Sequence, residues 1–150
     1  MLGRDKAAEI IREHGSNDLY EVIRSEGLSI ARLDFGGARF REFSVNGVIF
    51  LPLETESEAE ERSSLAHALG HHFLHVGNQV WMRGLDSMWS WKQERQAEEF
   101  AAWFLIPEAD ESRLEGLSAS EICDEFDVDA RIAEVRAGEW RRRASPQDSG

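Results

Sequence analysis

Two histidines and a glutamate have the residue types and the spacing of a metal site. His67 and His71 lie four positions apart. On a helix this spacing places the two side chains about 40° apart around the axis and about one turn apart along it, so both imidazoles can reach one ion. Catalytic zinc takes a third protein ligand and keeps one position open. Glu94, in the next predicted helix, is the natural third ligand.

The residue that follows the first histidine decides what such a site can do. In the H-E-x-x-H pattern of zinc peptidases, the glutamate between the histidines is the general base that takes a proton from the water molecule at the metal. Here that position is Ala68. The sequence therefore predicts a metal-binding site that lacks its proton acceptor.

Two predicted helices must bring the three candidate ligands together. Residues 55–58 read Thr-Glu-Ser-Glu, the pattern of a capping box, and acidic residues fill the first turn that follows. A helix is expected from there to about Val76, and it carries both histidines. A second helix is expected from about Trp91 until Pro107 ends it. The two metal-binding helices thus fall within residues 56–106.

Shorter elements are predicted before this helix pair. Apolar residues at helical spacing predict two helices within residues 1–27. Apolar residues that tend to alternate predict a small antiparallel sheet over residues 28–52. Asn46-Gly47 predicts a two-residue hairpin turn inside it, because both turn positions need a positive φ.

Two further helices are predicted after the pair, within residues 111–143. A capping box at Ser118 opens the first, and Asp129 opens the second. No repeat or linker divides the chain, so a single domain over residues 1–150 is expected. Its expected fold class is α+β, with a small antiparallel sheet packed against helices.

The composition excludes several classes of partner. The 17 Lys and Arg residues are outnumbered by 29 Asp and Glu residues, which gives a net charge of −12. Direct nucleic-acid binding is therefore not expected, because phosphate backbones are repelled. No apolar run is long enough to span a membrane. The single Cys123 and the absence of an apolar leader sequence predict a cytoplasmic protein without disulfides.

Two segments together resemble the ImmA/IrrE family of zinc metallopeptidases. Residues 62–75 read RSSLAHALGHHFLH, and residues 94–107 read ERQAEEFAAWFLIP. The family pairs a helix that reads roughly L-A-H-E-x-G-H-x-x-L-H with a second that reads roughly E-x-x-A-N-x-F-A-x-x-L-L-x-P. Two matched motifs at the right separation are a far more specific signal than H-x-x-x-H alone.

The resemblance implies a zincin-like fold of the gluzincin type and a set of site residues. His67, His71 and Glu94 would hold one zinc ion. Glu98, one turn after the implied ligand, is expected to orient a zinc-bound imidazole. His75 matches a histidine that is common in the family and is expected near the site.

The resemblance also implies a substrate. Members usually cut a helix-turn-helix transcriptional repressor, so the expected activity is that of a zinc-dependent endopeptidase and the expected partner is a DNA-binding regulator. Ala68 falls where the family has its catalytic glutamate. Because a positioned general base is worth about 10² to 10⁴ in rate, this chain is expected to bind zinc and to be essentially inactive.

Other interpretations remain open at this point. Ala68 is either native or a substitution that traps an inactive protein, and a native alanine favours a pseudo-peptidase that acts as a protein-binding module. Direct DNA binding by the C-terminal helices would need a basic face, which residues 118–135 lack. Aromatic and methionine side chains near the site either line a peptide groove or complete the core: Trp81, Met82, Met88, Trp89, Trp91 and Trp103.

Overall fold

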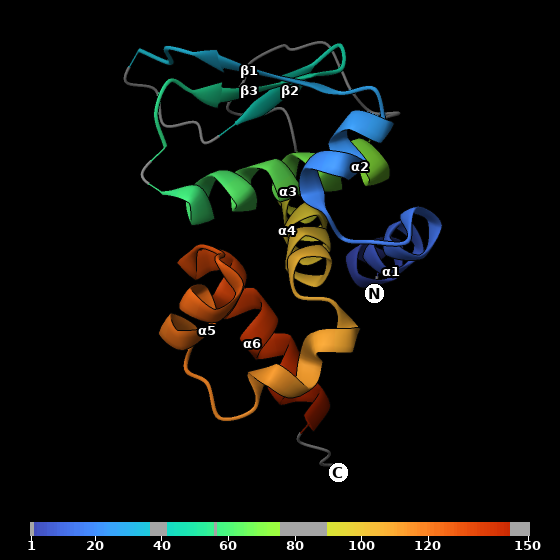
Figure 1. The fold of residues 1–150 in the computed structure, drawn as a ribbon, viewed down its shortest axis with the longest axis vertical. Coiled ribbons are helices and arrows are strands. Elements are labelled where there is room, and N and C mark those ends of the chain that lie inside the picture. The colour runs from blue at the N-terminus through green and yellow to red at the C-terminus, as the bar shows by residue number, and fades with distance from the viewer. Residues whose placement is uncertain (1, 37–41, 56, 76–89, 145–150) are drawn as a thin grey trace.

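The structure, a computed structural model, describes residues 2–36, 42–55, 57–75 and 90–144. Figure 1 shows a small sheet at one end, α3 directly beneath it, and α4 running from α3 toward α5 and α6 at the other end. The N-terminal helices α1 and α2 lie to one side of α4. The elements in chain order are α1 (Leu2–His14), α2 (Leu19–Ser25), β1 (Ser29–Leu33), β2 (Phe43–Val45), β3 (Val48–Pro52), α3 (Glu58–His75), α4 (Trp91–Leu105), the 3-10 helix η3 (Glu108–Leu114), α5 (Ala119–Phe126) and α6 (Ala130–Ala144).

The sheet is mixed, and the prediction of an antiparallel sheet was wrong for one of its strands. The hairpin is confirmed: β2 and β3 pair antiparallel around Asn46 and Gly47, whose φ angles are 50° and 81°. However, β3 is the central strand, and β1 pairs with its other edge in a parallel arrangement. The chain therefore crosses from one edge of the sheet to the other between β1 and β2. The pairing of β1 with β3 joins strands that are not adjacent in the sequence, so the local alternation of apolar residues does not reveal it.

One face of the sheet packs on the helix that carries the histidines. In β3, Ile49 and Leu51 are buried, whereas the residues that alternate with them are only partly buried. This alternation places one side of β3 against α3. At the edge, the guanidinium of Arg32 in β1 donates a hydrogen bond of 2.6 Å to Glu61 of α3. The sheet is thus fixed directly over the first metal-binding helix.

The helix α4 forms the centre of the molecule. It packs against α1, α3 and α6, and its second half is almost entirely buried. The rings of Phe100 and Phe104 stack with centroids 5.5 Å apart. The second half reads FAAWFL, which is apolar on all sides, as expected of a segment in a core. The first half, which carries Glu94, is thus anchored by the buried second half.

The observed helix starts refine the predicted ones. The capping boxes at Ser90 and Ser118 are both present, and the carboxylate of Asp129 accepts a hydrogen bond from the backbone of Ile132. The predicted capping residue Thr55 was wrong, because α3 begins at Glu58 and the Ser57 hydroxyl accepts the hydrogen bond from the Glu60 backbone, at 3.1 Å. Val76, the predicted end of this helix, lies outside the described residues.

Candidate metal centre

Three side chains from two helices converge at one point. His67 and His71 project from neighbouring turns of α3, with ring centroids 4.9 Å apart. Glu94 projects from the first turn of α4. One oxygen of its carboxylate, Oε1, lies 2.9 Å from Nε2 of His67 and 3.3 Å from Nε2 of His71. The potential ligand atoms of the three residues all lie within 4.8 Å of one another. The structure therefore brings together the set that the spacing predicted.

The donor set fits zinc. Two imidazole nitrogens and one carboxylate oxygen are the ligands of many catalytic zinc sites, in which a fourth position is left open. The two histidines are largely enclosed, with side chains 14% and 7% exposed, while the Glu94 side chain is 43% exposed. The cluster is therefore enclosed on the α3 side and accessible from the side of Glu94.

Burial and neighbouring charges shift the pKa values of all three residues of the cluster. Burial lowers the pKa of His67, but the negative charges of Glu42 and Glu94 outweigh this effect and raise that pKa to about 10. Burial raises the pKa of Glu94, yet hydrogen bonds from His67 and His71 hold it well below its usual range. Burial lowers the pKa of His71, and the charge of His67 acts in the same direction. The cluster thus combines two carboxylates, Glu42 and Glu94, with a protonated His67 imidazole.

His75 lies against the back of His71, where the sequence left its role open. The Nδ1 atoms of the two rings are 3.0 Å apart, and Nε2 of His75 lies 2.9 Å from the Oε1 oxygen of Gln96. An amide oxygen only accepts hydrogen bonds, so Nε2 of His75 donates to Gln96. This contact holds the His75 ring against Nδ1 of His71, on the side away from Glu94.

Gln96 and Glu42 were both missed by sequence reasoning. The Glu42 carboxylate pairs with Nδ1 of His67 through Oε2. This contact spans 25 positions and joins the residue before β2 to α3. No spacing rule links a strand edge to a helix in this way, so only the sheet topology could have revealed it. Gln96 carries a weak local signal, since it lies two positions after Glu94.

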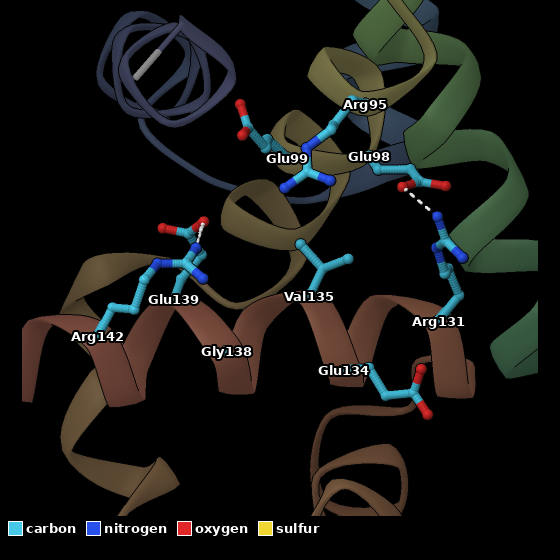
Figure 2. A pocket seen from close by; sticks show the side chains of 9 residues that line it. All are labelled: Arg95, Glu98, Glu99, Arg131, Glu134, Val135, Gly138, Glu139 and Arg142. Carbon is cyan, nitrogen blue, oxygen red and sulfur yellow. Dashed lines mark hydrogen bonds and ion pairs between the residues drawn. The ribbon is translucent and has the colours of Figure 1, made fainter. Parts of the chain in front are cut away.

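Glu98 is not brought to the cluster. Its carboxylate accepts a hydrogen bond of 2.9 Å from Arg131 of α6. Figure 2 shows both side chains at one end of a pocket between α4 and α6. Arg95 and Glu99 also line this pocket. The orienting role expected for Glu98 therefore finds no support in its contacts.

His72, which follows His71 in α3, is engaged outside the cluster. Its Nε2 lies 3.0 Å from a Glu26 oxygen, and its side chain is 26% exposed. Ala68 is 3% exposed and belongs to the hydrophobic core. The position of the expected general base is thus filled by a buried methyl group.

The suggested aromatic groove receives little support from the described residues. Trp103 is buried, and the Arg136 guanidinium lies 3.6 Å from its ring centroid. Trp91 is 76% exposed at the start of α4. The remaining candidates, Trp81, Met82, Met88 and Trp89, lie outside the described residues.

Comparisons with known proteins agree with this geometry. Residues 23–136 match the model of the IrrE N-terminal-like domain family, a family of peptidases. The chain is also 24% identical over 146 residues to the metallopeptidase ImmA of Bacillus subtilis (strain 168), an alignment that covers 89% of this chain and 82% of that protein. Across the described ranges, no helix combines the length and apolar character needed to cross a membrane.

Proposed function

Because the chain belongs to the ImmA/IrrE family of metallopeptidases, we propose that His67, His71 and Glu94 hold one zinc ion at which a protein substrate binds. The observation that carries this proposal is the convergence of two Nε2 atoms on one oxygen of Glu94. Imidazole rings that present Nε2 to a shared carboxylate already have the arrangement that a metal ion needs, so little reorganisation would accompany binding.

When bound, zinc would supply Lewis-acid polarisation of a peptide carbonyl and would acidify a water molecule. The protein residues would hold the ion and orient its ligands. Ala68 cannot accept a proton, because its side chain is a methyl group. We therefore infer that hydrolysis by this chain is about 10² to 10⁴ slower than with a glutamate at that position.

The proposed substrate is a helix-turn-helix transcriptional regulator. The resemblance to the ImmA/IrrE family suggests this class, and the net charge of −12 supports it. DNA-binding proteins carry basic surfaces, and an acidic partner attracts such a surface over several ångströms. The same charge opposes direct contact of this chain with nucleic acid.

A second candidate function is a pseudo-peptidase that binds a protein partner without cutting it. The burial of Ala68 favours this alternative, because the methyl group is packed in the core. A catalytic base must instead reach the metal and the substrate. Zinc would then have a structural role, or would hold a partner's carboxylate or carbonyl in place.

Elemental analysis of the purified protein tests the metal site. The wild type and the His67→Ala variant are compared with His72→Ala, a matched control whose imidazole pairs with Glu26 outside the cluster. We expect about one zinc per chain in the wild type and in the control, and none in His67→Ala. A wild-type protein without stoichiometric metal would end the metallopeptidase proposal. Equal zinc in all three proteins would place the ion elsewhere.

A further inference from the structure

Glu42 is a buried carboxylate that the proposed zinc ligation does not use. Its side chain is only 6% exposed. Oε2 pairs with Nδ1 of His67, and among the described residues no donor reaches Oε1. Burying a carboxylate is costly unless its charge is paired. Within the described part of the chain, the imidazole of His67 is the group that compensates this cost, so the two side chains act as a unit.

The sheet holds Glu42 in place. The residue immediately precedes β2, in which Phe43 pairs with Phe50 of the central strand. The two phenyl rings stack with centroids 5.0 Å apart. Since β3 packs on α3 through its buried face, the hairpin delivers the carboxylate to the helix at the level of the first candidate ligand.

The geometry limits what Glu42 can do. The two nitrogens of an imidazole lie on opposite sides of the ring. Glu42 occupies the Nδ1 side of His67, whereas Glu94 lies at Nε2. The ring therefore separates Glu42 from the point where the ligand atoms converge. In this arrangement Glu42 is neither a fourth ligand nor a substitute for the missing base at position 68.

We propose that Glu42 is a positioning residue of the metal centre: it accepts the Nδ1 hydrogen of His67 and thereby holds the ring with Nε2 toward the ion. This inference rests on the proposed zinc site. A carboxylate on the far nitrogen fixes the tautomer and makes the ligating nitrogen a stronger donor. His71 has an imidazole, that of His75, at its Nδ1 instead of a carboxylate. The two histidine ligands are thus supported unequally, and His67 is the stronger donor.

Cobalt binding by variants at position 42 tests the role. Titration with Co²⁺ measures affinity, and the visible spectrum of bound Co²⁺ reports ligand geometry independently of activity. Glu42→Gln keeps an acceptor but removes the charge, and Glu42→Ala removes both. Glu98→Gln is the matched control, because that carboxylate pairs with Arg131. Thermal unfolding with a chelator present identifies any variant that fails to fold.

We expect the affinity for Co²⁺ to fall about tenfold in Glu42→Gln and up to about 100-fold in Glu42→Ala. The spectrum should change in Glu42→Ala, while Glu98→Gln should match the wild type in both measurements. Folded Glu42 variants with wild-type affinity and spectrum would overturn the proposal. A wild-type protein that binds no Co²⁺ would instead remove the zinc site on which the proposal rests.

A measurement on the wild type requires no substitution. In the zinc-loaded protein, the Nδ1 hydrogen of His67 should give a downfield, slowly exchanging proton resonance in NMR spectra, because a buried carboxylate accepts it. Assignment of the histidine ring nitrogens identifies this signal. A zinc-loaded His67 that is bound through Nδ1, or whose Nδ1 carries no hydrogen, would overturn the proposal even if every variant failed to fold.

Discussion

Gly70 of α3 lies directly against Ala97 of α4. A Cβ atom on Gly70 would lie 2.8 Å from the Ala97 carbonyl oxygen and 2.9 Å from its Cα atom. Real Cβ atoms do not approach a backbone so closely, so the absence of a side chain at position 70 sets the distance between the two helices. That distance also sets the gap between the histidines of α3 and the carboxylate of Glu94.

Gly70→Ala should therefore weaken both the fold and the metal site. The added methyl group must push α4 away from α3, and overpacking of this kind costs about 1 to 3 kcal/mol of stability. The same displacement would move Glu94 away from His67 and His71. We expect a lower unfolding temperature and weaker zinc binding, measured by thermal unfolding and by competition with a chelating dye.

Gly138→Ala is the matched control. Gly138 also lies in a helix, but the atom nearest to a Cβ at this position would be a flexible Arg142 nitrogen, 3.9 Å away. Replacing a helical glycine that has room for a methyl group stabilises a protein by up to about 1 kcal/mol. If Gly70→Ala behaved like this control, close packing of α3 and α4 would not determine the site.

Zinc binding should release a proton near neutral pH. The carboxylates of Glu42 and Glu94 raise the pKa of His67 to about 10, so its imidazole is protonated in the metal-free protein. A metal ion needs the Nε2 lone pair, and that proton must leave. Calorimetric titrations near neutral pH, in buffers with different heats of ionisation, should give a release of about one proton per zinc. A release near zero would contradict the charged state of His67.

The stability of the metal-free protein should fall as the pH rises. His67 has a folded-state pKa of about 10, above its ordinary value of 6.5. The stabilisation that protonated His67 provides is therefore complete below about pH 6.5 and is lost between about pH 6.5 and about pH 10. Over this range the free energy of unfolding should fall by at most about 1.4 kcal/mol per pH unit. Thermal unfolding in the presence of a chelator measures this trend.

His67→Gln provides the control for this pH dependence. The variant cannot titrate at position 67, so the decline in stability above about pH 6.5 should flatten. Glu94 acts at the acidic end of the pH range. Its pKa is lowered from 4.5, so its contribution to the stability of the fold is lost as the pH falls below that value. An identical alkaline decline in the wild type and in His67→Gln would assign the trend to other groups.

Local patterns were sufficient for the parts of the fold that depend on short spacing. The hairpin at Asn46-Gly47 follows from the positive φ that both residues require. The pairing of His67 with His71 follows from the helical repeat. The cap of α3 was placed two residues early, because Thr55 and Ser57 are both hydroxyl residues with a glutamate three positions later. Only the backbone geometry separates these two candidates.

Local patterns could not predict contacts between residues that are far apart in the sequence. The parallel pairing of β1 with β3 depends on a crossover, and the alternation of apolar residues is the same for either strand direction. Glu42 approaches His67 only because that topology sets the hairpin over α3. Glu98 had the better sequence position, one turn after Glu94, yet α6 supplies Arg131 as its partner. Tertiary packing therefore decided which carboxylate supports the cluster.

Ala68→Glu should convert the chain into an active peptidase if the rest of the site is intact. The zinc-loaded wild type, Ala68→Glu and Ala68→Gln are incubated with a peptide library made by digesting a bacterial proteome, and cleavage is quantified by mass spectrometry. We expect Ala68→Glu to cut about 10² to 10⁴ faster than the other two, which is the usual contribution of a general base.

The glutamine variant separates chemistry from packing. Position 68 is buried, so both variants must displace core side chains to a similar extent, and their unfolding temperatures should fall together. Only the glutamate can accept a proton. A difference in cleavage between them that a chelator abolishes would therefore assign proton transfer to position 68. Equal cleavage by the wild type and Ala68→Glu that a chelator abolishes would contradict the inference that Ala68 limits hydrolysis, and it would also count against the pseudo-peptidase alternative.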